Sequence, residues 1–141
     1  MKIFDDISKV NVPVLSDGQL YIYVLENSPQ GNIKIGRSSN IQQRLRALSG
    51  SNSGGNHITR IAVSDATWLY TLEHLLHNHF SMYRIEGTEW FFGEDMTFDS
   101  VVEYIENLFV SDEYATCNRV RCEFVHTYSM LCRQLVANDV A

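Results

Sequence analysis

The sequence has few of the residues that break or cross-link a chain, and it has no long apolar stretch. Its 141 residues include two prolines and three cysteines. An odd number of cysteines without framework spacing does not indicate a disulfide scaffold, so we expect a reducing, cytoplasmic environment. No apolar run approaches the roughly 18 residues that a membrane span needs, and the first ten residues do not have the pattern of a signal peptide. These absences favour one folded domain with no membrane partner.

Basic residues are also scarce, since 11 Lys and Arg stand against 17 Asp and Glu, for a net charge of −6. Taken alone, this balance argues against nucleic acid, because every phosphate repels an acidic chain. The charges are segregated, however. Residues 27–64 contain five cations and no acid, whereas residues 85–118 contain nine acids and no Lys or Arg. The pattern has two interpretations: a solvated acidic helix face, or a cationic face that meets phosphates while the acidic segment is turned away.

Hydrophobic periodicity predicts an α+β domain in which helices flank a three-stranded antiparallel sheet, with one short extra strand. The predicted strands cover residues 19–26, 33–37, 57–63 and 88–92, and the predicted helices cover 39–48, 66–80, 97–109 and 117–136. Small polar residues over 49–56 predict a loop. Ser38 or Ser39 is expected to cap the first helix. His79, on the apolar stripe of the second helix, is expected to be a core histidine.

The predicted elements divide the chain into three parts. Residues 1–18 are expected to be an irregular N-terminal extension, and residues 19–93 the core of the domain. Residues 94–141 are expected to be a C-terminal helical extension packed on the core. This extension has two interpretations, a cap on the core or a surface for a homodimer.

Two tripeptides lie on the predicted hairpin, YIY over residues 21–23 and KIG over residues 34–36. Arg44 follows in the next helix and Glu73 in a later one. This ordered series resembles the GIY-YIG nuclease superfamily over residues 19–93. It is most similar to a small phage and bacterial subgroup, which has Lys-Ile-Gly in its second tripeptide and ends its core in Glu-Trp-Phe. The resemblance implies a three-stranded antiparallel core and hydrolysis of DNA phosphodiester bonds.

The resemblance also implies a role for each matching residue. Arg44 would bind the phosphate, because a guanidinium stays charged and contacts two oxygens at once. Glu73 would hold Mg²⁺ or Mn²⁺ as a Lewis acid, and His77 is a further candidate ligand. Tyr23 would orient or deprotonate water, and as a base it would need its pKa of about 10 lowered by a nearby cation or metal.

Lys34 departs from the pattern, since many relatives have tyrosine at the start of the second tripeptide. It could act as the base with a depressed pKa, or it could contact phosphate and leave Tyr23 as the base. The cationic block adds further candidates for DNA binding. These are Arg37, Ser38, Arg46 and Arg60.

The sequence therefore predicts a metal-dependent endonuclease acting on DNA. One alternative is a catalytically weakened module of the same fold that binds nucleic acid or protein. A second alternative is a nuclease acting on RNA. A small domain has little surface for reading bases, so we expect low sequence specificity or a homodimer through the C-terminal helices.

Overall fold

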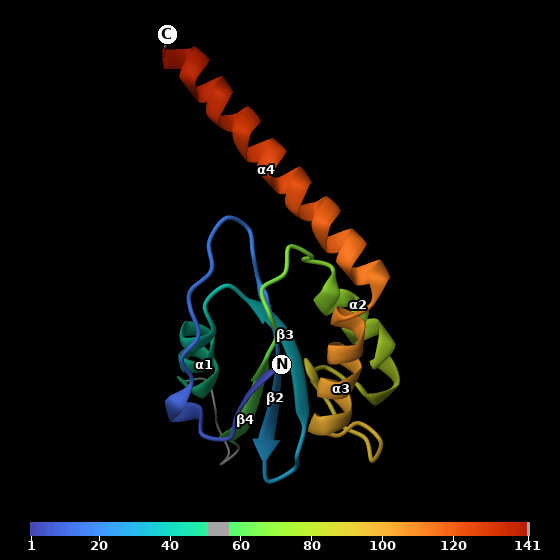
Figure 1. Ribbon diagram of the computed structural model, residues 1–141. Coiled ribbons are helices and arrows are strands. Elements are labelled where there is room, and N and C mark those ends of the chain that lie inside the picture. The colour runs from blue at the N-terminus through green and yellow to red at the C-terminus, as the bar shows by residue number, and fades with distance from the viewer. Residues whose placement is uncertain (51–56, 141) are drawn as a thin grey trace.

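The computed structural model describes residues 1–50 and 57–140, and its centre is a five-stranded antiparallel sheet with the strand order β1-β4-β2-β3-β5 (Figure 1). The strands are β1 (Lys2–Phe4), β2 (Tyr21–Ser28), β3 (Ile33–Ser38), β4 (His57–Val63) and β5 (Trp90–Phe91). The helices are α1 (Ile41–Gly50), α2 (Leu72–His79), α3 (Phe98–Phe109) and α4 (Asp112–Val140), with short 3-10 turns η1 (Ile7–Lys9) and η2 (Ser81–Tyr83). The α+β class predicted from the sequence is confirmed.

The β2–β3 hairpin is the middle of the sheet, and its residues are almost all buried. Aromatic and β-branched side chains favour this pleated, enclosed position. The Asn27 side chain closes the turn by accepting a hydrogen bond from the Asn32 backbone N–H at 2.8 Å. The resulting register places Tyr23 opposite Gly36 and Val24 opposite Ile35. The two tripeptides predicted to share a hairpin thus lie on paired strands and meet at one pair, Tyr23 opposite Gly36.

The sheet buries a separate apolar cluster on each face, because successive side chains of a strand point to opposite sides. Tyr23 and Leu25 pack with Ile41 and Leu45 of α1, on what we call the α1 face. Ile22 packs with residues of α2 and α3 on the other face. Figure 1 shows α1 on one side of the sheet and α2 and α3 on the other. The alternation of side chains along β3 therefore decides on which face of the sheet each candidate site residue of this strand lies.

The sheet has two more strands than the predicted core of three. Residues 1–18 were expected to be irregular, yet Lys2–Phe4 forms β1 and pairs with β4. A three-residue strand is too short for the alternation that marks a strand in a sequence. β5, predicted as a separate short strand, joins the same sheet by pairing with Ile33 and Lys34.

Helix α2 begins six residues later than the sequence predicts. The residues before it form a loop in which Thr67 bridges to Leu20, and the Asn118 side chain accepts hydrogen bonds from the Thr67 hydroxyl and the Trp68 backbone. These long-range hydrogen bonds replace those of the first helical turn.

His79 is exposed and stacks on Tyr104 at 4.0 Å between centroids, so the prediction of a core histidine is wrong.

Helix α1 is capped by a residue other than the two predicted serines. The Asn40 side-chain oxygen accepts a hydrogen bond from the Gln43 backbone at 3.1 Å. Ser38 instead stabilises the turn before the helix, because its hydroxyl exchanges two hydrogen bonds with the Asn40 backbone. The loop predicted over residues 49–56 lies outside the described residues, except for the last two residues of α1.

Helix α4 is longer than predicted and projects from the body of the fold (Figure 1). Its first turns pack against α3 and the loop before α2. Large apolar side chains recur along this helix and are exposed, as Phe124 and Leu131 show. Within the described residues, no helix has the length and apolar character needed to cross a membrane.

Candidate functional site

The candidate site lies along the outer edge of β3. β5 pairs with only the first two residues of β3, so within residues 1–50 and 57–140 the outer edge from Ile35 onward has no strand beside it. His77 of α2 takes that place at one point, where its Nε2 lies 2.7 Å from the carbonyl oxygen of Ile35. A carbonyl only accepts, so Nε2 carries the proton and donates it. That nitrogen therefore has no lone pair for a metal, and the structure disfavours His77 as a ligand through it.

Tyr23 reaches this edge by lying across Gly36. It is 3% exposed, and a Cβ placed on Gly36 would overlap the Tyr23 ring and hydroxyl. Gly36 has no positive φ, so the requirement for glycine comes from this close approach and not from the backbone. Glycine is therefore required in the second tripeptide because any side chain at position 36 would overlap the tyrosine of the first.

Burial raises the pKa of Tyr23 to about 12, because the ionised phenolate would lose its water. The Arg44 guanidinium opposes this shift, while the carboxylates of Glu73 and Glu89 add to it. Charged groups from α1, α2 and the β5 hairpin therefore all act on one hydroxyl. At neutral pH this hydroxyl is protonated and is a hydrogen-bond donor.

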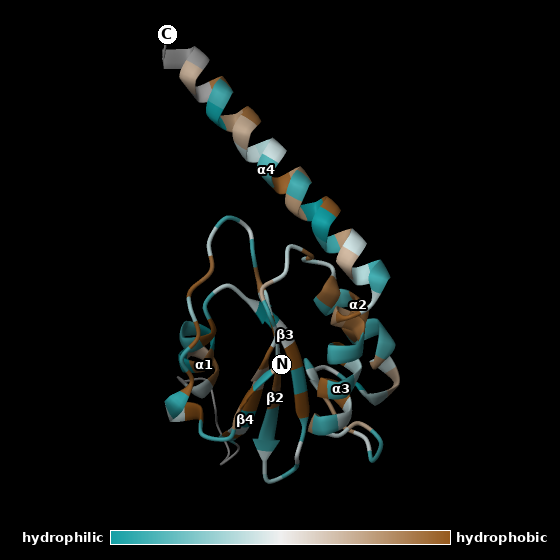
Figure 2. Cartoon of the chain, in the orientation of Figure 1, coloured by the Kyte–Doolittle hydropathy of each residue, from teal (hydrophilic) through white to brown (hydrophobic). Residues whose placement is uncertain are grey.

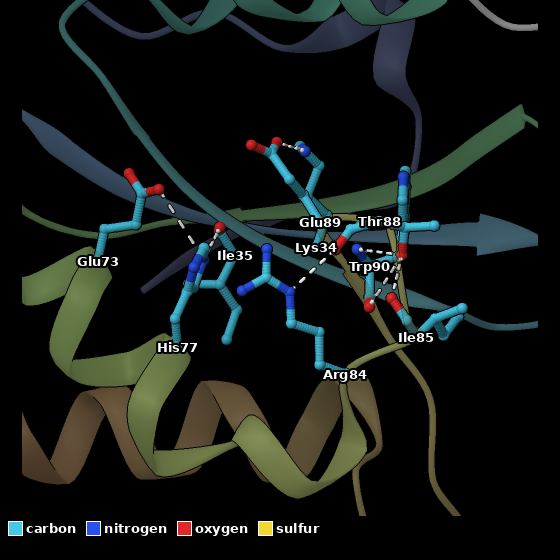
Figure 3. Close-up of polar contacts among 9 residues, drawn as sticks. All are labelled: Lys34, Ile35, Glu73, His77, Arg84, Ile85, Thr88, Glu89 and Trp90. Atoms are coloured by element: carbon cyan, nitrogen blue, oxygen red, sulfur yellow. Dashed lines mark hydrogen bonds and ion pairs between the residues drawn. The ribbon is translucent and has the colours of Figure 1, made fainter.

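Lys34 lies on the same face as Tyr23 and is almost fully buried. Its Nζ donates to Glu89 Oε2 at 2.6 Å and lies 5.8 Å from the centre of the Trp90 ring (Figure 3). The hydrogen bond from Lys34 is the main reason that the pKa of Glu89 is below its usual range. An ammonium group that donates to a carboxylate has no lone pair with which to act as a base.

An open groove of about 650 Å³ runs between the end of β3 and the start of α1. Its lining includes Arg37 and Arg44 together with polar side chains from Ser38, Ser39, Asn40 and Gln43, and the ring of Tyr70. Among the residues that the structure describes, no carboxylate lines it. Arg44 is exposed and has no ion-pair partner in the described part of the chain. Both features suit the binding of an anion.

Glu73 lies at the border of this region, on the first turn of α2. One of its carboxylate oxygens is 3.5 Å from Arg37 Nε. The other is 3.9 Å from His77 Nε2, and Figure 3 shows this second contact. Arg37 also donates to the Tyr70 carbonyl oxygen at 2.8 Å. Glu73 is 30% exposed, so its oxygens remain accessible to solvent.

Two of the predicted DNA-binding residues lie away from the groove. Arg46 lines a hollow beside η1, on another side of α1. Arg60 stacks on Phe98 at 4.0 Å and lies 2.8 Å from Asp99, with Glu26 and Asp5 within 4 Å. Three carboxylates surround this one guanidinium and outweigh its positive charge. Arg60 therefore does not fit the predicted role of binding a phosphate.

Sequence reasoning missed several residues of the site. Glu89 was seen only as part of a motif, yet it holds Lys34 across 55 positions of sequence. Arg84 lies outside the cationic block, but its charge also lowers the pKa of Glu89 (Figure 3). Gln43 lines the groove one residue before Arg44. Helical spacing was the one available signal, because it sets Gln43 and Arg44 side by side on the predicted helix over 39–48.

The α+β fold carries a cationic groove, and comparison with known families indicates that the domain is a nuclease-like or nucleic-acid-binding module. The chain belongs to the T5orf172 domain family, whose model matches residues 20–109. That family is related to nucleases of the GIY-YIG and HNH types. No curated protein and no solved structure matches the chain.

Proposed function

We propose that the protein is a metal-dependent endonuclease that hydrolyses the phosphodiester bonds of DNA. The observation that carries the proposal is the carboxylate-free lining of the groove, with Arg44 unpaired in the described chain and its charge acting on the Tyr23 hydroxyl. A phosphate in this groove would meet two guanidinium groups, from Arg37 and Arg44. The chain as a whole is acidic, so we expect binding to be confined to this face and to weaken steeply with salt.

Glu73 is the residue that would hold a divalent cation. Its contacts with Arg37 and His77 are longer than direct hydrogen bonds, so both oxygens can accept a ligand. In the described part of the chain, no three His, Cys, Asp or Glu residues come together to hold a metal. One carboxylate suits Mg²⁺, which keeps several waters and takes substrate phosphate oxygens. When bound, the ion supplies a Lewis acid that stabilises the developing charge on the phosphate.

Tyr23 is assigned the role of a donor that orients the attacking water or a phosphate oxygen. To act as a base near pH 7 it would need its pKa lowered from about 12 by roughly five units, which corresponds to about 7 kcal/mol. Lys34 is assigned a supporting charge rather than a base, because Glu89 holds its ammonium group at 2.6 Å. Arg44 would bind the negative charge that grows on the phosphate during attack.

A binding module without cleavage is the second candidate. The observation that favours it is the ion pair between Arg37 and Glu73, which satisfies the candidate metal ligand with a cation of the same chain. As a binding module, the protein would bind a phosphate in the groove without cleaving the phosphodiester bond.

Cleavage of supercoiled plasmid, measured with Mg²⁺ and with a chelator, tests the proposal. Glu73→Gln removes the charge of the candidate ligand while keeping its shape, and Glu103→Gln makes the same change at an exposed position of α3. We expect Mg²⁺-dependent nicking by the wild type and the Glu103 variant, and its loss in the Glu73 variant. Anisotropy of a labelled duplex reports binding separately.

The other outcomes identify the rival functions. Binding of the duplex without cleavage by any form would contradict the endonuclease and support the binding module. Cleavage of labelled RNA with no cleavage of DNA would show that the substrate is RNA and not DNA. Equal loss of cleavage in both glutamine variants would remove Glu73 from the mechanism.

A further inference from the structure

Helix α4 carries a row of large apolar side chains that the rest of the described chain leaves exposed. Each member of this row, which we call the α4 stripe, is between 53% and 66% exposed: Val120, Phe124, Tyr128, Leu131 and Leu135. Figure 2 shows hydrophobic segments recurring along the helix to a point well beyond the body of the fold. A row of this size on a projecting element marks an interaction surface.

The contacts of α4 with the body involve a different side of the helix. Asn118 accepts a hydrogen bond from the Trp68 backbone at 2.7 Å, and His126 packs edge-on against the Trp68 ring at 5.2 Å. Val125 lies beside the turn at Gly18. At about 100° per residue, Asn118 and Val125 point roughly a third of a turn away from the stripe, and His126 points to about the opposite side of the helix. The stripe therefore stays open although the base of the helix is docked.

The spacing of the stripe is that of a helix pairing with another helix. Phe124, Tyr128, Leu131 and Leu135 follow one another at intervals of four, three and four residues, as in the seam of a coiled coil. The helix has 29 residues, and its second half extends beyond the body. A helical segment as short as this projecting half is only marginally stable in water by itself, so its apolar stripe needs a partner that stabilises it.

We infer that the partner is the α4 stripe of a second copy of this chain. The positions that flank the seam are uncharged at Val125, Thr127, Cys132 and Gln134. Two identical stripes therefore meet without repulsion between like charges, and no charge pattern selects a different chain. Half-exposed side chains of this size offer on the order of 500 Å² per copy, so a pair buries about 1,000 Å², which reaches the minimum expected of a biological interface.

Pairing through α4 would also set two grooves in a fixed relation. Arg121 at the base of the helix stacks on Tyr70 at 4.6 Å, and Tyr70 lines the groove. In its consequence for cleavage this inference rests on the proposed function, since two linked sites would act on the two strands of one duplex. The existence of the dimer does not depend on any catalytic activity.

Sedimentation equilibrium of the full chain tests the inference. We expect a mass of twice 16.2 kDa at micromolar concentrations. Leu131→Glu places a charge in the middle of the stripe and should return the protein to the monomer. Met130→Glu is the matched control, because Met130 is just as exposed but points away from the stripe. This control should remain a dimer.

Circular dichroism separates loss of pairing from loss of folding. Leu131 is half-exposed, so the body should unfold in urea at the same concentration in both variants, with helix content reduced only in Leu131→Glu. A monomeric wild type, or two variants with the same mass, would overturn the inference. Neither result bears on the endonuclease, which plasmid cleavage measures independently.

Discussion

Replacing Gly36 with alanine puts a methyl group where the Tyr23 ring and hydroxyl lie. The ring must move, and it is 3% exposed among packed neighbours with no free space to enter. Overpacking of this kind costs about 1–3 kcal/mol. The backbone itself would favour the change, because φ is not positive at Gly36 and alanine in a strand is about 0.5–1 kcal/mol better than glycine. We therefore expect a net loss of about 1–2 kcal/mol in the free energy of unfolding.

A second background isolates the cause of that loss. In Tyr23→Val the side chain stops short of Gly36, so adding alanine there should stabilise the protein by about 0.5–1 kcal/mol. Urea denaturation of the four proteins in this cycle, followed by circular dichroism, gives the coupling energy. An equal cost of Gly36→Ala in both backgrounds would refute the close approach as the reason for glycine. The sign change is the expected result.

Three further predictions concern the charged groups around the sheet. Tyr23 has a pKa raised to about 12 in the folded state, so stability should be full below pH 10 and fall by about 2–3 kcal/mol as the pH rises through 12. Urea denaturation measured at each pH in this range should show that Tyr23→Phe lacks this part of the loss of stability. Arg60→Ala should lower stability by about 1–2 kcal/mol, through its stacking on Phe98, and leave plasmid cleavage unchanged. Glu89→Gln should lower stability by about 1–3 kcal/mol by leaving the buried Lys34 unpaired, and adding Lys34→Met should restore most of it. Denaturation that is insensitive to Glu89→Gln would contradict this account of the pair.

The sequence was most informative where structure depends on neighbours along the chain. Aromatic, β-branched and turn residues predicted the β2–β3 hairpin, although the register that sets Tyr23 against Gly36 came only from the structure. Helical periodicity predicted α3, which buries Phe98, Val101, Val102 and Ile105. Each of these elements carries its full signal within about a dozen residues.

The sequence was least informative where a distant residue decides the outcome. The start of α2 depends on the Asn118 side chain, about 50 positions away. Arg60 counted as a free cation until folding placed Asp99 beside it. Periodicity located the α4 stripe but could not show that nothing in the described chain covers it. Such features depend on tertiary contacts, which local patterns do not contain.

The central claim is that the groove between β3 and α1 binds the phosphate that is cleaved. Arg44 and Arg46 are exposed arginines two positions apart on α1, and only Arg44 lines the groove. The most direct test is the rate of Mg²⁺-dependent plasmid nicking by Arg44→Ala and Arg46→Ala. We expect a loss of about 100- to 1,000-fold in Arg44→Ala and little change in Arg46→Ala. Equal losses in the two variants, or the larger loss in Arg46→Ala, would contradict the claim.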